Sequence, residues 1–257
     1  MSLITAQDLV HPGFVTGGQP RNYATHPVGY LACAKPFDLP LMTDDEIEAA
    51  IKRKDADSSW LSQIRDRGMF GGRIPSRDQN GRGYCWMHSG VSAVLLCRAR
   101  DNQPYADLSA YAGACIIKQF RDQGGWGSEG IEFMAERGIP TSEFWPQKSV
   151  ARANDNPQTW ANAAKYKITE WMDLDPRNVR QLATCLCNDI PVVTDFNWWG
   201  HSVCACRLKR WNGGRNILIT IWNSWADSWK EYGMGDLEGN QAIPDGQIAP
   251  RVIYAAA

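Results

Sequence analysis

The periodicity of the chain changes once, near residue 190, from helical to extended, and this order restricts the fold more than any other feature. Helices are predicted over residues 43–54, 85–100, 107–121, 128–138 and 175–188, and strands over 191–196, 202–210, 216–222 and 234–238. The run Asn212-Gly213-Gly214 predicts a hairpin turn. Helices followed by antiparallel strands are typical of an α+β protein with two lobes, and a cleft between the lobes is the natural place for a site.

The N-terminal part of the chain lacks this regularity. Residues 1–42 are rich in Gly, Pro and Asn, and residues 60–84 are again loop-like. Between them, Thr43 and Glu46 form a capping-box pattern that starts one short helix. We therefore expect an N-terminal arm or extension over residues 1–69, followed by a folded domain over residues 70–257. Three roles stay open for the arm: a short pro-region, a structural element, or a segment that docks on a protein assembly.

Composition excludes several partners. The 257 residues include 27 Lys and Arg against 28 Asp and Glu, so the chain lacks the basic excess expected of a nucleic-acid binder. The longest apolar run, residues 91–97, is too short for a membrane span, and the first thirty residues do not resemble a secretory signal. We therefore expect a cytoplasmic or virion-associated protein whose eight cysteines are reduced thiols.

Residues 79–86 (QNGRGYCW) bring a cysteine to the first turn of a predicted helix. Free N–H groups and the positive end of the helix dipole stabilise a thiolate there, so we expect a lowered pKa for Cys85. A thiolate is a far better nucleophile than a thiol. Gln79 lies six residues upstream, where its side-chain N–H and the backbone N–H of Cys85 would form a two-donor oxyanion hole.

A nucleophilic cysteine needs an imidazole base, and the base needs an orienting partner. His201 stands where a strand begins, and Asn223 ends the next strand of the predicted hairpin. Pairing of the two strands would place these side chains together. The neutral amide of Asn223 would then fix the imidazole ring and its tautomer, and Trp225 would shield the hydrogen bond from water.

Other candidate sites have simpler interpretations. Cys185 and Cys187 are two residues apart on a predicted helix, so their side chains point to opposite sides and do not easily chelate one zinc ion. Cys204 and Cys206 share one face of a predicted strand and are expected to pack as small hydrophobic residues. His88, one turn past Cys85, is expected to be a core or cleft-edge histidine. We expect neither a metal nor another cofactor.

Taken in order, several short motifs resemble those of the papain-like cysteine peptidases over roughly residues 70–240. The spacing of Gln79 and Cys85-Trp86 is similar to the family pattern Gln-x-Gly-x-Cys-Gly-x-Cys-Trp. The other matching segments are Leu108-Ser109, Gln123-Gly124-Gly125, Gly138-Ile139, Phe144-Trp145-Pro146, Gly200-His201, Asn223-Ser224-Trp225, Trp229 and Gly233-x-Gly235. Each is modest alone, but their shared order is specific.

The resemblance implies a two-lobed papain-like fold, with the nucleophile helix in a helical lobe and antiparallel strands in the other. It implies that Cys85 is the nucleophile, that His201 is its base and acid, that Asn223 orients His201, and that Gln79 stabilises the oxyanion. The implied substrate-binding residues are Gly124, Gly125, Trp86 and Trp225. Glycine permits close approach of substrate backbone. The implied reaction is peptide hydrolysis through an acyl-thioester, with a peptide or protein as substrate.

The sequence departs from the family pattern in ways that bear on its setting. Arg82 stands where family members usually have a disulfide cysteine, which suits a reducing environment. His201 follows Cys85 by 116 residues, fewer than the family's usual spacing of about 130–150. The shortening falls between Pro191 and His201, so the cleft there is expected to differ. The N-terminal residues also show no strong two-helix pattern of an inhibitory pro-region. Together these features favour the bacterial or phage-type branch.

Two functions follow. The first is an active papain-like cysteine peptidase that uses Cys85, His201, Asn223 and Gln79. The alternative is a structural or docking protein, for example a virion component, that retains the fold with little or no turnover and uses its arm to dock. An inactive docking protein should tolerate Cys85→Ala, whereas a peptidase should not.

Overall fold

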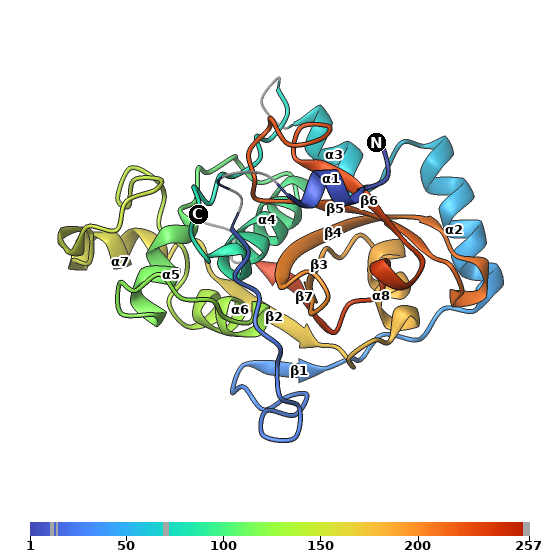
Figure 1. Ribbon diagram of the computed structural model, residues 1–257, viewed down its shortest axis with the longest axis horizontal. Coiled ribbons are helices and arrows are strands. Elements are labelled where there is room, and N and C mark those ends of the chain that lie inside the picture. The colour runs from blue at the N-terminus through green and yellow to red at the C-terminus, as the bar shows by residue number, and fades with distance from the viewer. Residues whose placement is uncertain (11–12, 14, 69–71, 254–257) are drawn as a thin grey trace.

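The computed structural model describes residues 1–10, 13, 15–68 and 72–253, with the backbone alone for the last two (Figure 1). Its helices are α1 (Ala6–Leu9), α2 (Asp44–Ala56), α3 (Leu61–Arg67), α4 (Cys85–Arg100), α5 (Ala110–Ile117), α6 (Gly127–Glu136), α7 (Pro157–Ala163) and α8 (Val179–Cys187). Its strands are β1 (Ala34–Pro36), β2 (Ile168–Asp173), β3 (Val192–Phe196), β4 (His201–Arg210), β5 (Leu218–Trp222), β6 (Met234–Glu238) and β7 (Gly246–Ile253).

All seven described strands join one sheet in the order β1-β2-β7-β3-β4-β5-β6. Only the β1–β2 pair is parallel; the other neighbours are antiparallel. The four strands expected from the sequence are present as β3, β4, β5 and β6. The sequence analysis missed β1, β2 and β7. Each of these pairs with a strand far away in the chain, so local alternation carries little of the signal.

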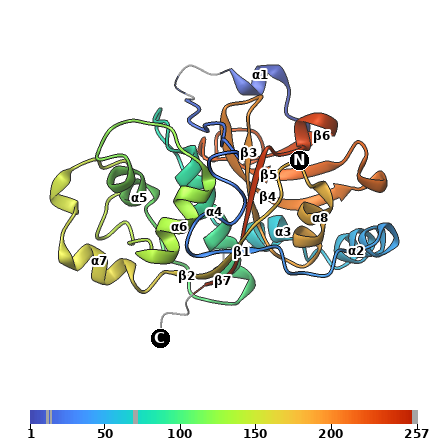
Figure 2. The ribbon, with the colours of Figure 1, turned by 90° about the horizontal axis from the view of Figure 1, so that it is seen from below.

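The sheet separates two hydrophobic clusters, and this arrangement confirms the predicted α+β fold with two lobes. Helix α4 packs against β3, β4 and β7, and together with α5 and α6 it encloses the first cluster. Helices α2 and α8 cover β4 from the other side and enclose the second. Figure 2 shows α4 to α7 on one side of the strands and α2 with α8 on the other.

Strand β4 alternates between these clusters. Cys204 and Cys206 are fully buried in the first cluster, whereas Val203 and Ala205 are buried in the second. The period of two residues therefore places His201 and Ser202, at the start of the strand, on opposite faces of the sheet. The two cysteines pack as small hydrophobic residues, as the sequence predicts.

Several predicted helix bounds are wrong. Residues 60–84 were expected to be a loop but contain α3, in which Arg65 is fully buried with its guanidinium over the Trp222 ring at 4.8 Å. Helix α8 begins at Val179 with Asn178 as its cap, instead of Asp175. The reason is Arg177, whose φ of 61° cannot continue a right-handed helix.

Helix α5 is shorter than the predicted span of residues 107–121. It begins after Ser109 and ends at Ile117. Gln119 and Phe120 have positive φ angles of 53° and 64°, which end the helical path. The sequence analysis missed α7, which has only seven residues. Within the described residues, no helix is long and apolar enough to span a membrane.

The N-terminal arm is packed onto the rest of the chain at several points. Leu3 bridges to Asp236 on β6, and β1 pairs with β2. The predicted cap of α2 is confirmed, since Thr43 and Glu46 form a reciprocal capping box. Ile47 and Ile51 of α2 are buried in the second cluster. The expected boundary after residue 69 lies outside the described residues and stays a prediction.

Candidate active site

Cys85 is the first residue of α4 and is fully buried. The preceding loop turns sharply, because Asn80 and Gly81 both have positive φ, at 50° and 69°. The Nε1 of Trp86 donates to the carbonyl of Gly83 at 3.0 Å and fixes the loop against the helix. The structure therefore places Cys85 at a helix N-terminus, as the sequence predicts.

His201 and Asn223 form the hydrogen bond that strand pairing predicts. The Nε2 of His201 lies 2.8 Å from the Oδ1 of Asn223. The backbone N–H of Ser224 donates to the same Oδ1 at 2.8 Å, so this atom must be an acceptor. Nε2 of His201 is consequently the donor, and Nδ1 carries the lone pair in the neutral ring. Nδ1 has no hydrogen-bond partner among the described residues and is the nitrogen available as a base.

Two tryptophans enclose the imidazole of His201. The ring centroid of Trp199 lies 4.6 Å from that of His201, and the centroid of Trp225 lies 4.7 Å away. The two indoles contact each other edge to face at 5.5 Å. His201 is fully buried as a result. Trp225 thus lies where the sequence analysis expected it to shield the hydrogen bond.

Gln79 is held as a donor. Its Oε1 accepts the hydroxyl of Ser224 at 2.6 Å, and its backbone N–H donates to the carbonyl of Ser224 at 2.9 Å. The amide nitrogen Nε2 is therefore fixed as the donor group. It donates to the carbonyls of Arg82 and Val15, both at 2.6 Å. The sequence analysis did not identify Ser224 as the residue that orients Gln79.

Residues 15–19 of the arm occupy this site, and we call this segment the strap. Gly18 donates its N–H to the carbonyl of Gly200 at 2.8 Å, while the N–H of Gly125 donates to the carbonyl of Gly17 at 2.9 Å. The N–H of Gln19 returns to the carbonyl of Gly125 at 3.1 Å. Figure 2 shows the N-terminal segment passing between the helical side and the strands. The strap thus lies across the cleft beside Cys85 and His201.

The fit of the strap depends on its two glycines. A Cβ added to Gly17 would lie 2.2 Å from the carbonyl oxygen of Gly83, and one added to Gly18 would lie 2.8 Å from the backbone nitrogen of His201. A Cβ on Gly124 would meet the Gly17 carbonyl oxygen at 2.4 Å. Gly124 therefore borders the strap, as a cleft residue would. The sequence analysis left the role of the arm open and did not locate the strap.

Trp86 and Gly125 form the adjoining wall of the cleft. A Cβ on Gly125 would lie 2.9 Å from the indole of Trp86, so any side chain there would collide with it. Glycine at this position lets the indole of Trp86 pack directly against the backbone whose N–H and carbonyl pair with the strap. The structure therefore brings Gly124, Gly125 and Trp86 to the cleft together.

Burial sets the charge state of Cys85 and His201. Loss of solvent raises the pKa of the Cys85 thiol to about 12, and burial lowers the pKa of His201 to about 4, partly offset by the Asn223 hydrogen bond. The sequence analysis expected a lowered pKa for Cys85. In the covered site the direction is opposite, because desolvation outweighs the helix dipole. Both groups are therefore neutral near pH 7.

His88 is a core residue. It is fully buried, its ring meets Tyr111 edge to face at 5.7 Å, and burial lowers its pKa to about 3. The His88 ring is therefore neutral near pH 7 and enclosed by the protein. Within the described residues, no group of three or more His, Cys, Asp or Glu side chains is arranged to hold a metal ion.

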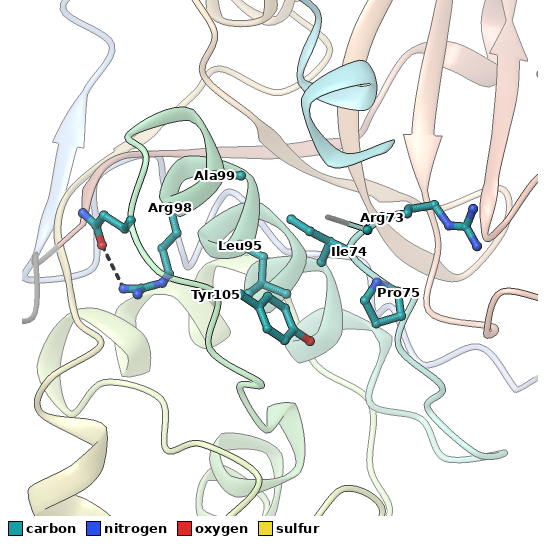
Figure 3. Close-up of a pocket in the computed structure, with 9 residues that line it drawn as sticks. Arg73, Ile74, Pro75, Leu95, Arg98, Ala99 and Tyr105 are labelled. Atoms are coloured by element: carbon teal, nitrogen blue, oxygen red, sulfur yellow. Dashed lines mark hydrogen bonds between the residues drawn. The ribbon is translucent and has the colours of Figure 1, made fainter. Parts of the chain in front are cut away.

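A separate pocket of about 200 Å³ lies near the other end of α4 (Figure 3). Leu95, Arg98 and Tyr105 line it, with Arg98 bonded to Gln103 at 2.8 Å. Leu95 is ten residues along α4 from Cys85, or about 15 Å at the rise of an α-helix. This pocket is therefore not part of the cysteine site.

The chain is similar in sequence to two curated relatives. The chain is 24% identical over 196 residues to zingipain-1 from Zingiber officinale, covering 69% of this chain and 87% of zingipain-1. It is 22% identical over 188 residues to peptidase 1 from Euroglyphus maynei, covering 65% of this chain but only 57% of that relative. No family model matches the chain.

Solved structures share the fold. Xylellain, a cysteine protease from Xylella fastidiosa, superposes with a TM-score of 0.56 at 20% identity, over 70% of this chain and 83% of xylellain. Digestive procathepsin L 3 from the larval midgut of Tenebrio molitor superposes with a TM-score of 0.65 at 16% identity, over 92% of this chain and 76% of the other. The chain therefore shares a papain-like fold with these two cysteine proteases and is similar in sequence to zingipain-1 and peptidase 1.

Proposed function

We propose that this chain hydrolyses peptide bonds of peptide or protein substrates through Cys85, His201 and Asn223. The observation that carries the proposal is the shared acceptor Oδ1 of Asn223, which makes Nε2 of His201 a donor and leaves Nδ1 as a base. A base with the correct tautomer next to a helix-terminal cysteine is the arrangement that nucleophilic catalysis requires.

In the proposed reaction, Nδ1 of His201 takes the proton of the Cys85 thiol, and the thiolate attacks the peptide carbonyl carbon. The oxyanion that forms is held by Nε2 of Gln79 and the backbone N–H of Cys85. The intermediate collapses to an acyl-thioester while His201 returns the proton to the departing amine. A water molecule, deprotonated by His201, then attacks the thioester and releases the acid and the Cys85 thiol.

We further propose that the described form is a closed precursor, in which the strap is an inhibitory segment. Nε2 of Gln79, the proposed oxyanion donor, is already bonded to the carbonyl of Val15. The main-chain groups of Gly125 are likewise bonded to the strap. These contacts favour the pro-region role of the arm over docking on a protein assembly. Docking elsewhere would not require the strap to bind Nε2 of Gln79 and the backbone N–H of Gly125.

The same proposal extends to the setting of the enzyme. All eight cysteines lie within the described residues, and all are free thiols. This supports a reducing compartment, cytoplasmic or virion-associated. It also supports assignment to the bacterial or phage-type branch, since Arg82 stands where a disulfide cysteine is usual in the family.

The test is covalent labelling of the full chain with an epoxide or fluoromethyl-ketone probe, mapped by peptide mass. We expect labelling at Cys85 in Gly17→Ala/Gly18→Ala, whose added Cβ atoms displace the strap, and little labelling in the parent chain. His201→Ala should abolish the labelling of the open variant. An open variant that folds, stays unlabelled and cleaves no peptide would instead favour the structural or docking alternative.

A further inference from the structure

A hollow of about 400 Å³ lies beside the turn that joins β3 to β4, and the proposed reaction does not use it. Three segments that are far apart in the chain form its walls. They contribute Arg177 before α8, Asn197 and Trp198 of the turn, and Asn240, Gln241 and Asp245 between β6 and β7. None of the strap residues lines it. The hollow is therefore within the size range of small-molecule sites and is not covered when the strap is in the cleft.

Trp198 gives this hollow a rigid aromatic wall. The residue is 40% exposed, although its indole is large and apolar. It stacks on the indole of Trp199, with ring centroids 5.6 Å apart and planes 18° apart. Its Nε1 donates to the backbone carbonyl of Gln241 at 3.3 Å. These two contacts hold the ring in place, so its exposed part is a preformed platform on which a flat apolar surface can stack.

Three side-chain amides stand around this platform. Asn197, Asn240 and Gln241 are all exposed. Within the described residues their side-chain amides form no hydrogen bond, and the bonds that residues 197 and 241 make use backbone atoms. An amide carries two donor hydrogens and an acceptor oxygen. The hollow therefore offers hydrogen-bond donors and acceptors together, next to an apolar ring.

The charges in the hollow are balanced. Nη1 of Arg177 donates to Oδ1 of Asp245 at 2.8 Å, and the backbone N–H of Asn197 donates to Oδ2 at 2.8 Å. Arg177 and Asp245 are the two charged residues among those that line the hollow. A small anion or cation therefore gains little net attraction there. A purely apolar ligand would remove water from the three amides without replacing its hydrogen bonds, which is costly.

We propose that this hollow is a carbohydrate-binding site, in which one sugar ring of a neutral glycan stacks on Trp198. A sugar ring has the required chemistry, because its C–H groups form an apolar face and its hydroxyl groups both donate and accept hydrogen bonds. The hydroxyls meet the three amides and the Arg177–Asp245 pair. The Trp199 ring contacts both Trp198 and His201, at 5.6 and 4.6 Å between centroids. The bound glycan thus lies one side chain away from the proposed catalytic base.

Binding is tested on the full chain, where the strap covers the cleft and no turnover is needed. The probes are maltose and N,N′-diacetylchitobiose, with uridine as a neutral ligand that stacks through a base instead of a sugar. Each is titrated to about 50 mM while the backbone N–H signals of residues 197, 240 and 241 are followed by NMR. We expect saturable shifts with at least one of the two sugars, and a weaker response to uridine.

Substitutions locate the binding. Trp198→Ala should weaken the affinity by at least about 10-fold, whereas Trp198→Phe, which keeps an aromatic face, should stay within about 3-fold of the parent chain. Gln241→Ala removes only the side-chain amide, because the carbonyl that holds Trp198 belongs to the backbone. It should also weaken binding, and it tests the site if Trp198→Ala does not fold. Tyr105→Ala is the matched control, since Tyr105 is 38% exposed but lines the other pocket.

Three results would overturn the proposal: no shift with either sugar, shifts that persist unchanged in Trp198→Ala or in Gln241→Ala, or tighter binding of uridine than of both sugars. The inference goes beyond the proposed peptidase function and does not rest on it. Failure of Cys85 labelling or of peptide cleavage would therefore contradict the peptidase proposal and leave the sugar titrations as they stand.

Discussion

Nε2 of Gln79 donates a 2.6 Å hydrogen bond to the carbonyl oxygen of Val15. The amide proposed to stabilise the oxyanion of a substrate is therefore already bonded to the strap. Ser224 orients the same amide from the other side. The donor geometry of the site is therefore already assembled in the closed form. In our proposal the strap blocks access to this donor and leaves its geometry intact.

Displacing the strap should expose Cys85. In Gly17→Ala/Gly18→Ala, the added Cβ atoms would collide with backbone atoms of Gly83 and His201, which cannot move aside cheaply. We expect the rate of probe labelling at Cys85 to rise by at least about 10-fold. Gly72→Ala is the matched control, because a Cβ there meets nothing within 4 Å. Equal labelling of all three proteins would show that the strap does not close the site.

The pH dependence of alkylation should differ between closed and open forms. Burial holds the pKa of Cys85 at about 12 and that of His201 at about 4 in the closed form. The thiolate fraction then rises about tenfold per pH unit, so iodoacetamide should modify Cys85 faster at every step from pH 5 to 9. The open variant should instead reach a plateau within this range. Peptide mapping separates Cys85 from exposed Cys33, which reports reagent activity. A plateau already present in the parent chain would contradict this account.

Loss of the oxyanion donor should lower turnover more than binding. In the open variant, Gln79→Ala should reduce kcat by about 100- to 1,000-fold with little change in KM, the usual cost of one such donor. Ser224→Ala should cause a smaller loss, because Gln79 keeps its amide but loses the hydroxyl that orients it. Steady-state kinetics measure both effects. A Gln79→Ala variant with unchanged kcat would exclude this residue from the oxyanion hole.

The tautomer of His201 should depend on Asn223. Asn223→Ala removes the acceptor of the Nε2–H bond, and we expect kcat in the open variant to fall by at least about 100-fold. Asn223→Asp keeps an acceptor for His201 and for the N–H of Ser224, so it should retain more activity than the alanine variant. Circular dichroism checks that both fold. Equal losses in the two variants would argue against a role for the shared acceptor.

Asp195 should destabilise the closed form at neutral pH. Burial raises its pKa from 3.8 to about 6, against the opposing effects of Ser202, Gly127 and Arg21 and in the same direction as Asp173. A raised pKa stabilises the fold fully below pH 3.8, and this contribution is lost as the pH rises through 6. Asp195→Asn should therefore raise the free energy of unfolding by roughly 1–3 kcal/mol at pH 8.

The effect of Asp195→Asn should shrink toward zero as the pH falls to about 4, where the native carboxyl is itself neutral. Thermal melts at pH 4.5, 6 and 8 measure this trend. Glu143→Gln, at an exposed carboxylate, is the control that should leave the melting temperature unchanged. A pH-independent effect of Asp195→Asn would rule out titration of this group as its cause.

The sequence alone determined the parts of the site that depend on local chemistry. A glycine-rich turn before an apolar helix places Cys85 at the helix N-terminus, and two alternating strands around Asn212-Gly213-Gly214 bring His201 to Asn223. These relations follow from helix capping, turn geometry and strand pairing between neighbours in the chain. The roles of those residues in turnover stay predictions.

Only the tertiary structure decided the course of the arm, the outer strands and the charge state of the site. The strap meets Gly125 and Gly200 from more than a hundred residues away, and β7 inserts between β2 and β3. Local periodicity carries no record of such contacts. The neutral state of Cys85 and His201 has the same origin, since a pKa depends on the solvent that distant segments exclude, whatever the helix dipole favours locally.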